Sequence, residues 1–204
     1  MAICYVVGAA PACVPFSPAP DDFVIAADGG QAALSRLRIL PDLVVGDFDS
    51  SPAPHGVATV THPAVKDDTD TALALAEGAA RGYRTFALYG CTGGRPDHAF
   101  GAVQTMLAYA RRGLRVYIVG EGMVGTVLVN DSFSFLPEGY VSVFALSERA
   151  EGVTLSGLKY TLTDATLTND YPIGVSNEGV GERATVSVRS GALYLLFEGN
   201  TLPL

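Results

Sequence analysis

Apolar and polar positions follow different patterns in the two parts of this chain. Up to Gly120, short apolar runs alternate with segments in which apolar residues recur every three or four positions. The apolar runs cover residues 2–8, 23–28, 43–49, 85–90 and 115–120, and the helical spacing covers 30–38, 69–81 and 96–112. Continuous apolar strands separated by helices are typical of a parallel sheet covered on both faces. We therefore predict a Rossmann-like α/β domain with a mainly parallel sheet.

After Gly120 the segments become short and alternating, and Gly, Pro and Asn-Asp separate them. They cover residues 124–130, 131–136, 140–146, 154–162, 182–189 and 191–199. Alternation of this kind indicates antiparallel strands packed as a sandwich or a barrel. We expect an α/β domain over residues 1–121 and an all-β domain over residues 122–204.

The charge of the chain argues against two classes of partner. It has 13 Lys and Arg against 21 Asp and Glu, a formal net charge of −8, so we expect neither nucleic acid nor an anionic membrane as the main partner. No apolar run approaches the ~18–20 residues of a membrane span. The three cysteines form no C-x-x-C pair, and the N-terminus lacks the charged segment of a secretion signal. We expect a protein of the reducing cytoplasm.

Acidic residues stand where the predicted parallel strands end. Asp28 follows the second strand, Asp47 and Asp49 follow the third, and the motif KDDTD precedes the second helix. Carboxyl ends of parallel strands meet at one edge of a sheet, where ligands bind. The residues expected at this edge are Asp28, Asp47, Asp49, Lys66, Asp67, Asp68, Asp70, Arg95 and Asp97. Mg²⁺ takes carboxylate and phosphate oxygens, and an extended backbone would direct Asp47 and Asp49 to the same side.

The motif CTGGRPDH supplies a complementary phosphate site. It follows a strand and opens a helix, with Pro96 suited to the first helical position. Gly93 and Gly94 let backbone N–H groups approach a phosphate, and the helix N-terminus adds partial positive charge. Arg95 can donate two hydrogen bonds to phosphate oxygens, and Lys66 adds a point charge. No G-K-[ST] sequence occurs, so this is not a Walker A loop.

Each fragment taken alone also has a structural interpretation. The acids after the third strand would fit a solvated turn, and Asp67 and Asp68 would fit an acidic helix start. Cys91 has no evident basic partner and is interpreted as a small buried filler. Tyr160 on an alternating strand would fit an ordinary aromatic of the sandwich. The placement of the polar motifs at strand ends favours the ligand-binding interpretation.

Six motifs together resemble the thiamine pyrophosphokinase family over nearly the whole chain. They are ADGG (27–30), PDLVVGDFDS (41–50), KDDTDTALAL (66–75), GCTGGRPDH (90–98), GVTLSGLKYTL (152–162) and GVSNEGVGERATVSVRSGALYLLF (174–197). The resemblance implies transfer of the pyrophosphoryl group of ATP to the hydroxyl of thiamine, giving thiamine diphosphate and AMP with Mg²⁺. It also implies a C-terminal β-sandwich and a homodimer, with thiamine bound between the α/β domain of one chain and the β domain of the other.

The resemblance assigns roles to individual residues. It implies Asp47, Asp49 and Asp70 as the magnesium and catalytic carboxylates, with Lys66 near the transferred phosphates. The expected ATP contacts are Asp28, Gly29, Gly30, Asp67, Thr69, Gly93, Gly94, Arg95, Asp97 and His98. Tyr160 would stack on thiamine, and Ser176 and Asn177 would hydrogen-bond its pyrimidine. Either Asp49 or Asp70 would take the hydroxyl proton.

Two other functions remain as alternatives. A phosphatase of haloacid-dehalogenase type uses a D-x-D motif, but places it after the first strand, whereas here it follows the third. A non-catalytic nucleotide- or metal-sensing module would bind ATP without turnover. Release of AMP only in the presence of thiamine separates these functions.

Overall fold

The computed structural model describes residues 1–11, 13–48, 56–62, 68–120 and 122–203. The chain forms two compact units: Met1–Thr105 with Ile118–Glu121, and Met106–Tyr117 with Gly122–Leu204. Residues Met106–Tyr117 group with the second unit, whereas Ile118–Glu121 group with the first, so no single position in the sequence separates the two units. The domain boundary after residue 121 therefore remains a prediction.

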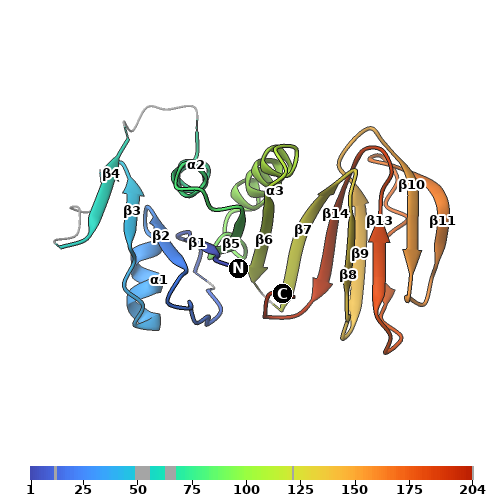
Figure 1. Ribbon diagram of the computed structural model, residues 1–204, viewed down its shortest axis with the longest axis horizontal. Helices are drawn as coiled ribbons and strands as arrows, with labels where there is room; N and C mark the ends of the chain where they lie inside the picture. The colour runs from blue at the N-terminus through green and yellow to red at the C-terminus, as the bar shows by residue number, and fades with distance from the viewer. Residues whose placement is uncertain (12, 49–55, 63–67, 121, 204) are drawn as a thin grey trace. The chain divides into compact units, whose positions relative to one another are not determined.

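The first unit, the α/β unit, is built on parallel strands (Figure 1). The strand order is β5-β1-β2-β3-β4, and neighbouring strands in it pair in parallel. The strands are β1 (Cys4–Val7), β2 (Phe23–Ala27), β3 (Leu43–Gly46), β4 (Ala58–Thr61) and β5 (Thr85–Tyr89), and β6 (Arg115–Gly120) follows as the strand divided between the units. All residues of β1, β3 and β5 are buried. This confirms the mainly parallel α/β fold.

Three helices accompany these strands, α1 (Gly30–Leu37), α2 (Asp70–Ala80) and α3 (Pro96–Ala110). They confirm the three predicted helices, with ends shifted by one or two residues. Helix α2 packs closely on the sheet at Gly78, where an added Cβ would lie 2.6 Å from Phe86 Cε1 and 2.7 Å from Cys4 Sγ. Strand β4 was not predicted, because its exposed sequence ATVT at the sheet edge lacks an apolar run.

The second unit, the β unit, contains two antiparallel sheets with orders β12-β9-β14-β7 and β11-β10-β13-β8. The strands are β7 (Met123–Val129), β8 (Ser132–Phe135), β9 (Tyr140–Ala145), β10 (Arg149–Ser156), β11 (Leu162–Thr168), β12 (Asn177–Glu178), β13 (Ala184–Ser187) and β14 (Ala192–Glu198). Phe135 of one sheet packs on Phe197 of the other, with ring centroids 4.5 Å apart. This contact closes a sandwich, as predicted.

One predicted segment of the β unit is wrong. Residues 154–162 are not a single strand, because β10 ends at Ser156 and β11 begins only at Leu162. Gly157 turns the chain with φ +67°, and an added Cβ there would lie 2.3 Å from Arg183 O. Tyr160 consequently lies on the connection between two strands, where it is 61% exposed.

Candidate functional site: a pocket at the strand ends

A pocket of about 370 Å³ opens in the α/β unit at the carboxyl ends of β1 and β5. Four segments converge on it: the turns after β1 and β5, the start of α2 and the first turns of α3. Its lining residues are Gly8, Ala9, Ala10, Pro11, Thr69, Thr71, Gly90, Cys91, Gly94, Arg95, His98 and Ala102. Such an edge is the usual ligand position in an open parallel sheet.

Two glycines bring the turns after β1 and β5 into backbone contact. Gly8 N donates to Tyr89 O (2.8 Å), and Ala10 N donates to Gly90 O (2.9 Å). An added Cβ at Gly8 would lie 2.7 Å from Gly90 O, and one at Gly90, where φ is +61°, would lie 2.6 Å from Gly8 O. The absence of both side chains therefore leaves the pocket walled by backbone on this side.

The N-terminus of α2 contributes hydroxyl groups and partial positive charge to the pocket. Thr69 is the N-cap, with φ −74° and ψ 154°, and its Oγ1 accepts a hydrogen bond from Ala72 N (3.2 Å). Thr71, the second residue of α2, also lines the pocket. The dipole of this 11-residue helix favours a bound anion at its N-terminus.

The glycine loop (residues 91–95) lines another part of the pocket and leads into α3. Gly93 has φ +75°, in the left-handed region where glycine is preferred. At Gly94 an added Cβ would lie 3.6 Å from both Ala10 Cβ and Pro11 Cδ, which is ordinary contact. Gly94 lines the pocket, and so does His98, the third residue of α3. A second helix N-terminus thus faces the same space.

Arg95 and Asp97 form an exposed ion pair at the pocket rim. Arg95 Nη2 lies 2.5 Å from Asp97 Oδ2, and Arg95 Nε donates to Asp97 Oδ1 (3.1 Å). The hydrogen bond from Arg95 holds the pKa of Asp97 below its usual value, and the same bond raises the pKa of Arg95. His98 N also donates to Asp97 Oδ1 (3.0 Å). Asp97 thus orients the guanidinium at the start of α3.

The predicted carboxylates follow neighbouring strands. Asp28 directly follows β2 and has φ +47°, and its N–H donates to Val45 O of β3 (2.7 Å). Asp47 follows β3 and Asp70 begins α2, and both are half-buried. Helix α2 packs on β3, so these two carboxylates belong to elements in contact.

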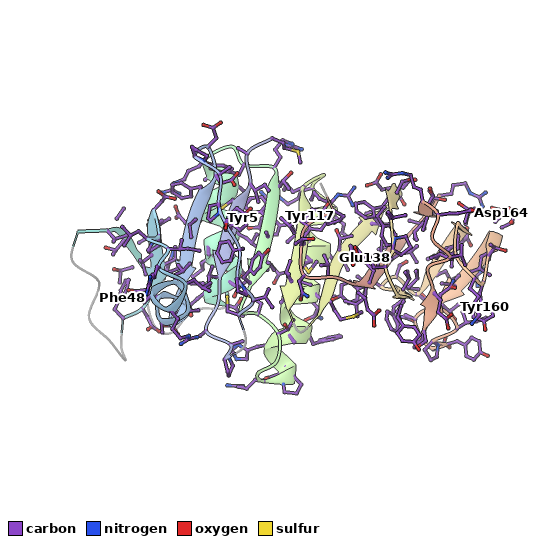
Figure 2. All side chains as sticks on the ribbon, turned by 90° about the horizontal axis from the view of Figure 1, so that it is seen from below. Tyr5, Phe48, Tyr117, Glu138, Tyr160 and Asp164 are labelled. Atoms are coloured by element: carbon purple, nitrogen blue, oxygen red, sulfur yellow. The ribbon has the colours of Figure 1, made fainter. Side chains whose placement is uncertain are left out.

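One expectation about the D-x-D motif is wrong. The backbone is not extended through it, because β3 ends at Gly46 and Phe48 (Figure 2) has φ +55°. Asp49, Lys66 and Asp67 lie outside the described residues. Within the described ranges, no group of three His, Cys, Asp or Glu residues is arranged to hold a metal ion. Two carboxylates with hard oxygen donors nevertheless fit Mg²⁺, which is typically held by one or two carboxylates plus phosphate oxygens.

The predicted thiamine contacts lie together in the β unit. Ser176 is exposed, has φ +58°, and its N–H donates to Ser142 Oγ (3.1 Å). Asn177 is only 6% exposed, and its side chain is hydrogen-bonded to the backbone of Tyr160. The three predicted residues are therefore neighbours in space.

Several pocket residues were not predicted from the sequence. They are Gly8, Ala9, Ala10, Pro11, Thr71, Gly90, Cys91 and Ala102. Gly8 could have been predicted from the sequence, because it directly follows the first parallel strand, at the same edge of the sheet as the acidic residues. Cys91 lies in the pocket wall, its thiol donates to Tyr89 O (3.4 Å), and burial raises its pKa to about 11.

The fold and the pocket define an α/β protein with a pocket at the carboxyl ends of its parallel strands and with a β-sandwich unit added. The family model for the thiamin pyrophosphokinase catalytic domain matches residues 19–118, and the model for the thiamin pyrophosphokinase vitamin B1 binding domain matches residues 129–193. The chain belongs to the thiamine pyrophosphokinase family, which uses ATP. No helix among the described residues is long and apolar enough to cross a membrane.

Known relatives extend over most of the chain. The thiamine pyrophosphokinase of Bacillus subtilis is 27% identical over 195 residues, covering 84% of this chain and 85% of its own. The crystal structure of thiamin pyrophosphokinase from Geobacillus thermodenitrificans is 31% identical, with a TM-score of 0.85 and full coverage of both chains. The crystal structure of the Bacillus subtilis enzyme has a TM-score of 0.87 at 24% identity and covers 98% of this chain and all of its own.

Proposed function

We propose that this chain transfers the pyrophosphoryl group of ATP to the hydroxyl of thiamine, giving thiamine diphosphate and AMP. The observation that carries the proposal is the pocket at the ends of β1 and β5, where two helix N-termini and a glycine loop converge in a chain of this family. Transfer of this kind depends on positioning and on neutralising phosphate charge rather than on covalent chemistry from the protein.

The pocket residues hold the phosphates of ATP in this proposal. Backbone N–H groups of Gly93 and Gly94 and the N-terminus of α2 point donors at the phosphate oxygens. Arg95 turns from Asp97 toward the phosphates or shares its five N–H donors between them. The other proposed ATP contacts are Asp28, Gly29, Gly30, Lys66, Asp67, Thr69, Asp97 and His98.

Asp47, Asp49 and Asp70 are the proposed ligands of Mg²⁺. When bound, the ion would neutralise charge on the phosphate oxygens of ATP. Asp49 or Asp70 accepts the proton that the hydroxyl of thiamine loses as its oxygen attacks the β-phosphorus. A carboxylate needs to lie within hydrogen-bond reach of that hydroxyl to do so.

The β unit supplies the thiamine contacts, with Tyr160 as the aromatic face and Ser176 and Asn177 beside it. A desolvated aromatic face contributes about 1–2 kcal/mol to binding a cation. We further propose a homodimer, with the α/β domain (1–121) of one chain and the β domain (122–204) of the other at each site, and a cytoplasmic location. The family resemblance supports these assignments.

The test is to incubate the purified chain with Mg²⁺, ATP and thiamine and to separate the products by chromatography, omitting each component in turn. The proposal predicts AMP and thiamine diphosphate in equal amounts, and only when all three components are present. Inorganic phosphate released from a phosphoester would favour the phosphatase. ATP binding without turnover would favour the sensing module.

A further inference from the structure

Asn177 is a buried polar residue whose side chain makes three hydrogen bonds to backbone. Its Oδ1 accepts from Tyr160 N (2.9 Å) and from Glu178 N (2.9 Å), and its Nδ2 donates to Tyr160 O (2.6 Å). Only 6% of the residue is exposed. The amide therefore bonds both the N–H and the C=O of one residue 17 positions away in sequence.

The orientation of this amide follows from its partners. Two backbone N–H groups face one end of it, and only an oxygen can accept from both, so a flipped amide would place donors against donors. Oδ1 then has both lone pairs in use. Consequently the oxygen of Asn177 is not available to accept a hydrogen bond from a ligand.

Tyr160, by contrast, has a pinned backbone and an exposed ring. Its side chain is among the large apolar groups left open to solvent, at 61% exposure (Figure 2). Lys159 N donates to Glu178 O (2.9 Å), and Leu158 forms an isolated bridge with Gly179. Residues 158–160 are thus bound to the segment 177–179 by backbone, and Asn177 supplies the side-chain part of that attachment.

The charges beside the ring belong to the same attachment. Lys159 Nζ lies 5.6 Å from the centroid of the Tyr160 ring and 2.9 Å from Glu178 Oε2. The hydrogen bond to Glu178 raises the pKa of Lys159. One face of the ring is therefore beside an ammonium group whose charge is balanced by a carboxylate.

We infer that Asn177 is a positioning residue: it fixes the backbone of Tyr160 so that the ring is preorganised for thiamine, and it acts on thiamine through Tyr160. The inference rests on the proposed function and departs from the role expected for Asn177 from sequence, a direct bond to the pyrimidine. With its backbone fixed, Tyr160 has only its two side-chain torsions left to order on binding, which lowers the entropic cost of stacking.

A double-mutant cycle tests this inference. Asn177→Asp keeps two acceptors for the backbone N–H groups, but it removes the donor and places a carboxylate against Tyr160 O. We expect it to raise the KM for thiamine about tenfold with kcat little changed. In a Tyr160→Ala background the same change should have no further effect. Effects that multiply in the double variant would contradict the inference, because they would indicate a separate contact with thiamine.

A second readout needs no substrate. The chain contains no Trp, so Tyr160→Trp introduces a single fluorophore at the ring in question. We expect Asn177→Asp to lower the fluorescence anisotropy of Trp at position 160 in the absence of ligands. The matched control is Asn130→Asp, an asparagine of the β unit that directly follows β7 and whose Oδ1 accepts from Gly191 N (2.9 Å). An anisotropy that is equal in both variants would overturn the inference.

These measurements separate the inference from the proposed function. Circular dichroism establishes that each variant is folded, and Asn177→Ser replaces Asn177→Asp in both experiments should the latter fail to fold. A wild-type chain that makes no thiamine diphosphate would count against the proposed function. The anisotropy comparison needs no turnover, so it judges the positioning of Tyr160 independently.

Discussion

Helix α1 lies close against the end of β1 at Gly30, and this packing gives a sharp prediction. Gly30 begins α1, and an added Cβ would lie 1.9 Å from Val7 O and 2.7 Å from Val7 C. Both are backbone atoms at the end of β1, so no side-chain rotation relieves the contact. Gly30→Ala must therefore move the start of α1 or the end of β1 by about 1 Å, a displacement of the kind that accompanies overpacking.

Overpacking of this kind typically costs 1–3 kcal/mol, and we expect about 3 kcal/mol because the obstructing atoms are backbone. For a chain of this length that loss corresponds to a melting temperature lower by about 6–12 °C. The matched control is Gly101→Ala inside α3, where an added Cβ meets nothing within 4 Å. It should raise the free energy of unfolding by about 0.5–1 kcal/mol.

Urea denaturation followed by circular dichroism at 222 nm measures both variants. The reasoning predicts a lower midpoint for Gly30→Ala and a higher one for Gly101→Ala, with equal slopes. Equal stability of Gly30→Ala and the wild-type chain would refute it. The role implied for Gly30 by resemblance was an ATP contact, and the geometry adds a packing role for the same glycine.

Three further changes have expected outcomes. Thr126→Val removes the hydrogen bond from the fully buried Thr126 Oγ1 to Val116 O (3.0 Å), so it should lower the free energy of unfolding by about 1 kcal/mol in urea denaturation; an unchanged midpoint would contradict this. Cys91 lines the pocket, and burial raises its pKa to about 11, so its alkylation by iodoacetamide at pH 8 should be slow. Bound ATP should slow this alkylation further, as measured by peptide mass spectrometry. An alkylation rate that does not change with ATP would place the nucleotide elsewhere. Burial also raises the pKa of Cys4 and of Tyr194 to about 12, so the unfolded chain loses these protons at a lower pH than the folded chain does. The free energy of unfolding should therefore fall as the pH rises from about 9 to 12, by up to about 1.4 kcal/mol per pH unit for each group. Urea midpoints that stay constant over this range would show that the groups are solvated.

Much of the α/β fold was predictable, because buried parallel strands carry continuous apolar runs. Strand β4 (Ala58–Thr61) was not predicted, because an exposed edge strand has no continuous apolar run and because its pairing with β3 depends on the tertiary structure. The extended geometry expected through Asp47 and Asp49 failed at Phe48, whose φ of +55° is unusual for a bulky side chain. Local sequence gives no indication of such a backbone angle.

Residues of the candidate site could be predicted from the sequence where a polar or glycine-rich motif follows a strand. They could not be predicted where their position depends on contacts between residues far apart in the sequence. Ala9, Ala10 and Pro11 have no polar side chain, so their place in the pocket follows only from the pairing of β1 with β5. Asn177 was predicted to bond a ligand, but which partner satisfies a buried amide depends on residues far along the chain. In this case that partner is the backbone of Tyr160.

The most direct test of the central claim is to measure the products in a carboxylate variant. Asp47→Asn and Asp70→Asn remove a negative charge each with little change of shape, and Asp170→Asn in the β unit is the control. With Mg²⁺, ATP and thiamine, we expect the wild-type chain and the control to form one AMP per thiamine diphosphate, and both site variants to lose at least about a hundredfold in rate while remaining folded. Normal turnover in both site variants, or ADP in place of AMP in the wild-type reaction, would contradict the account.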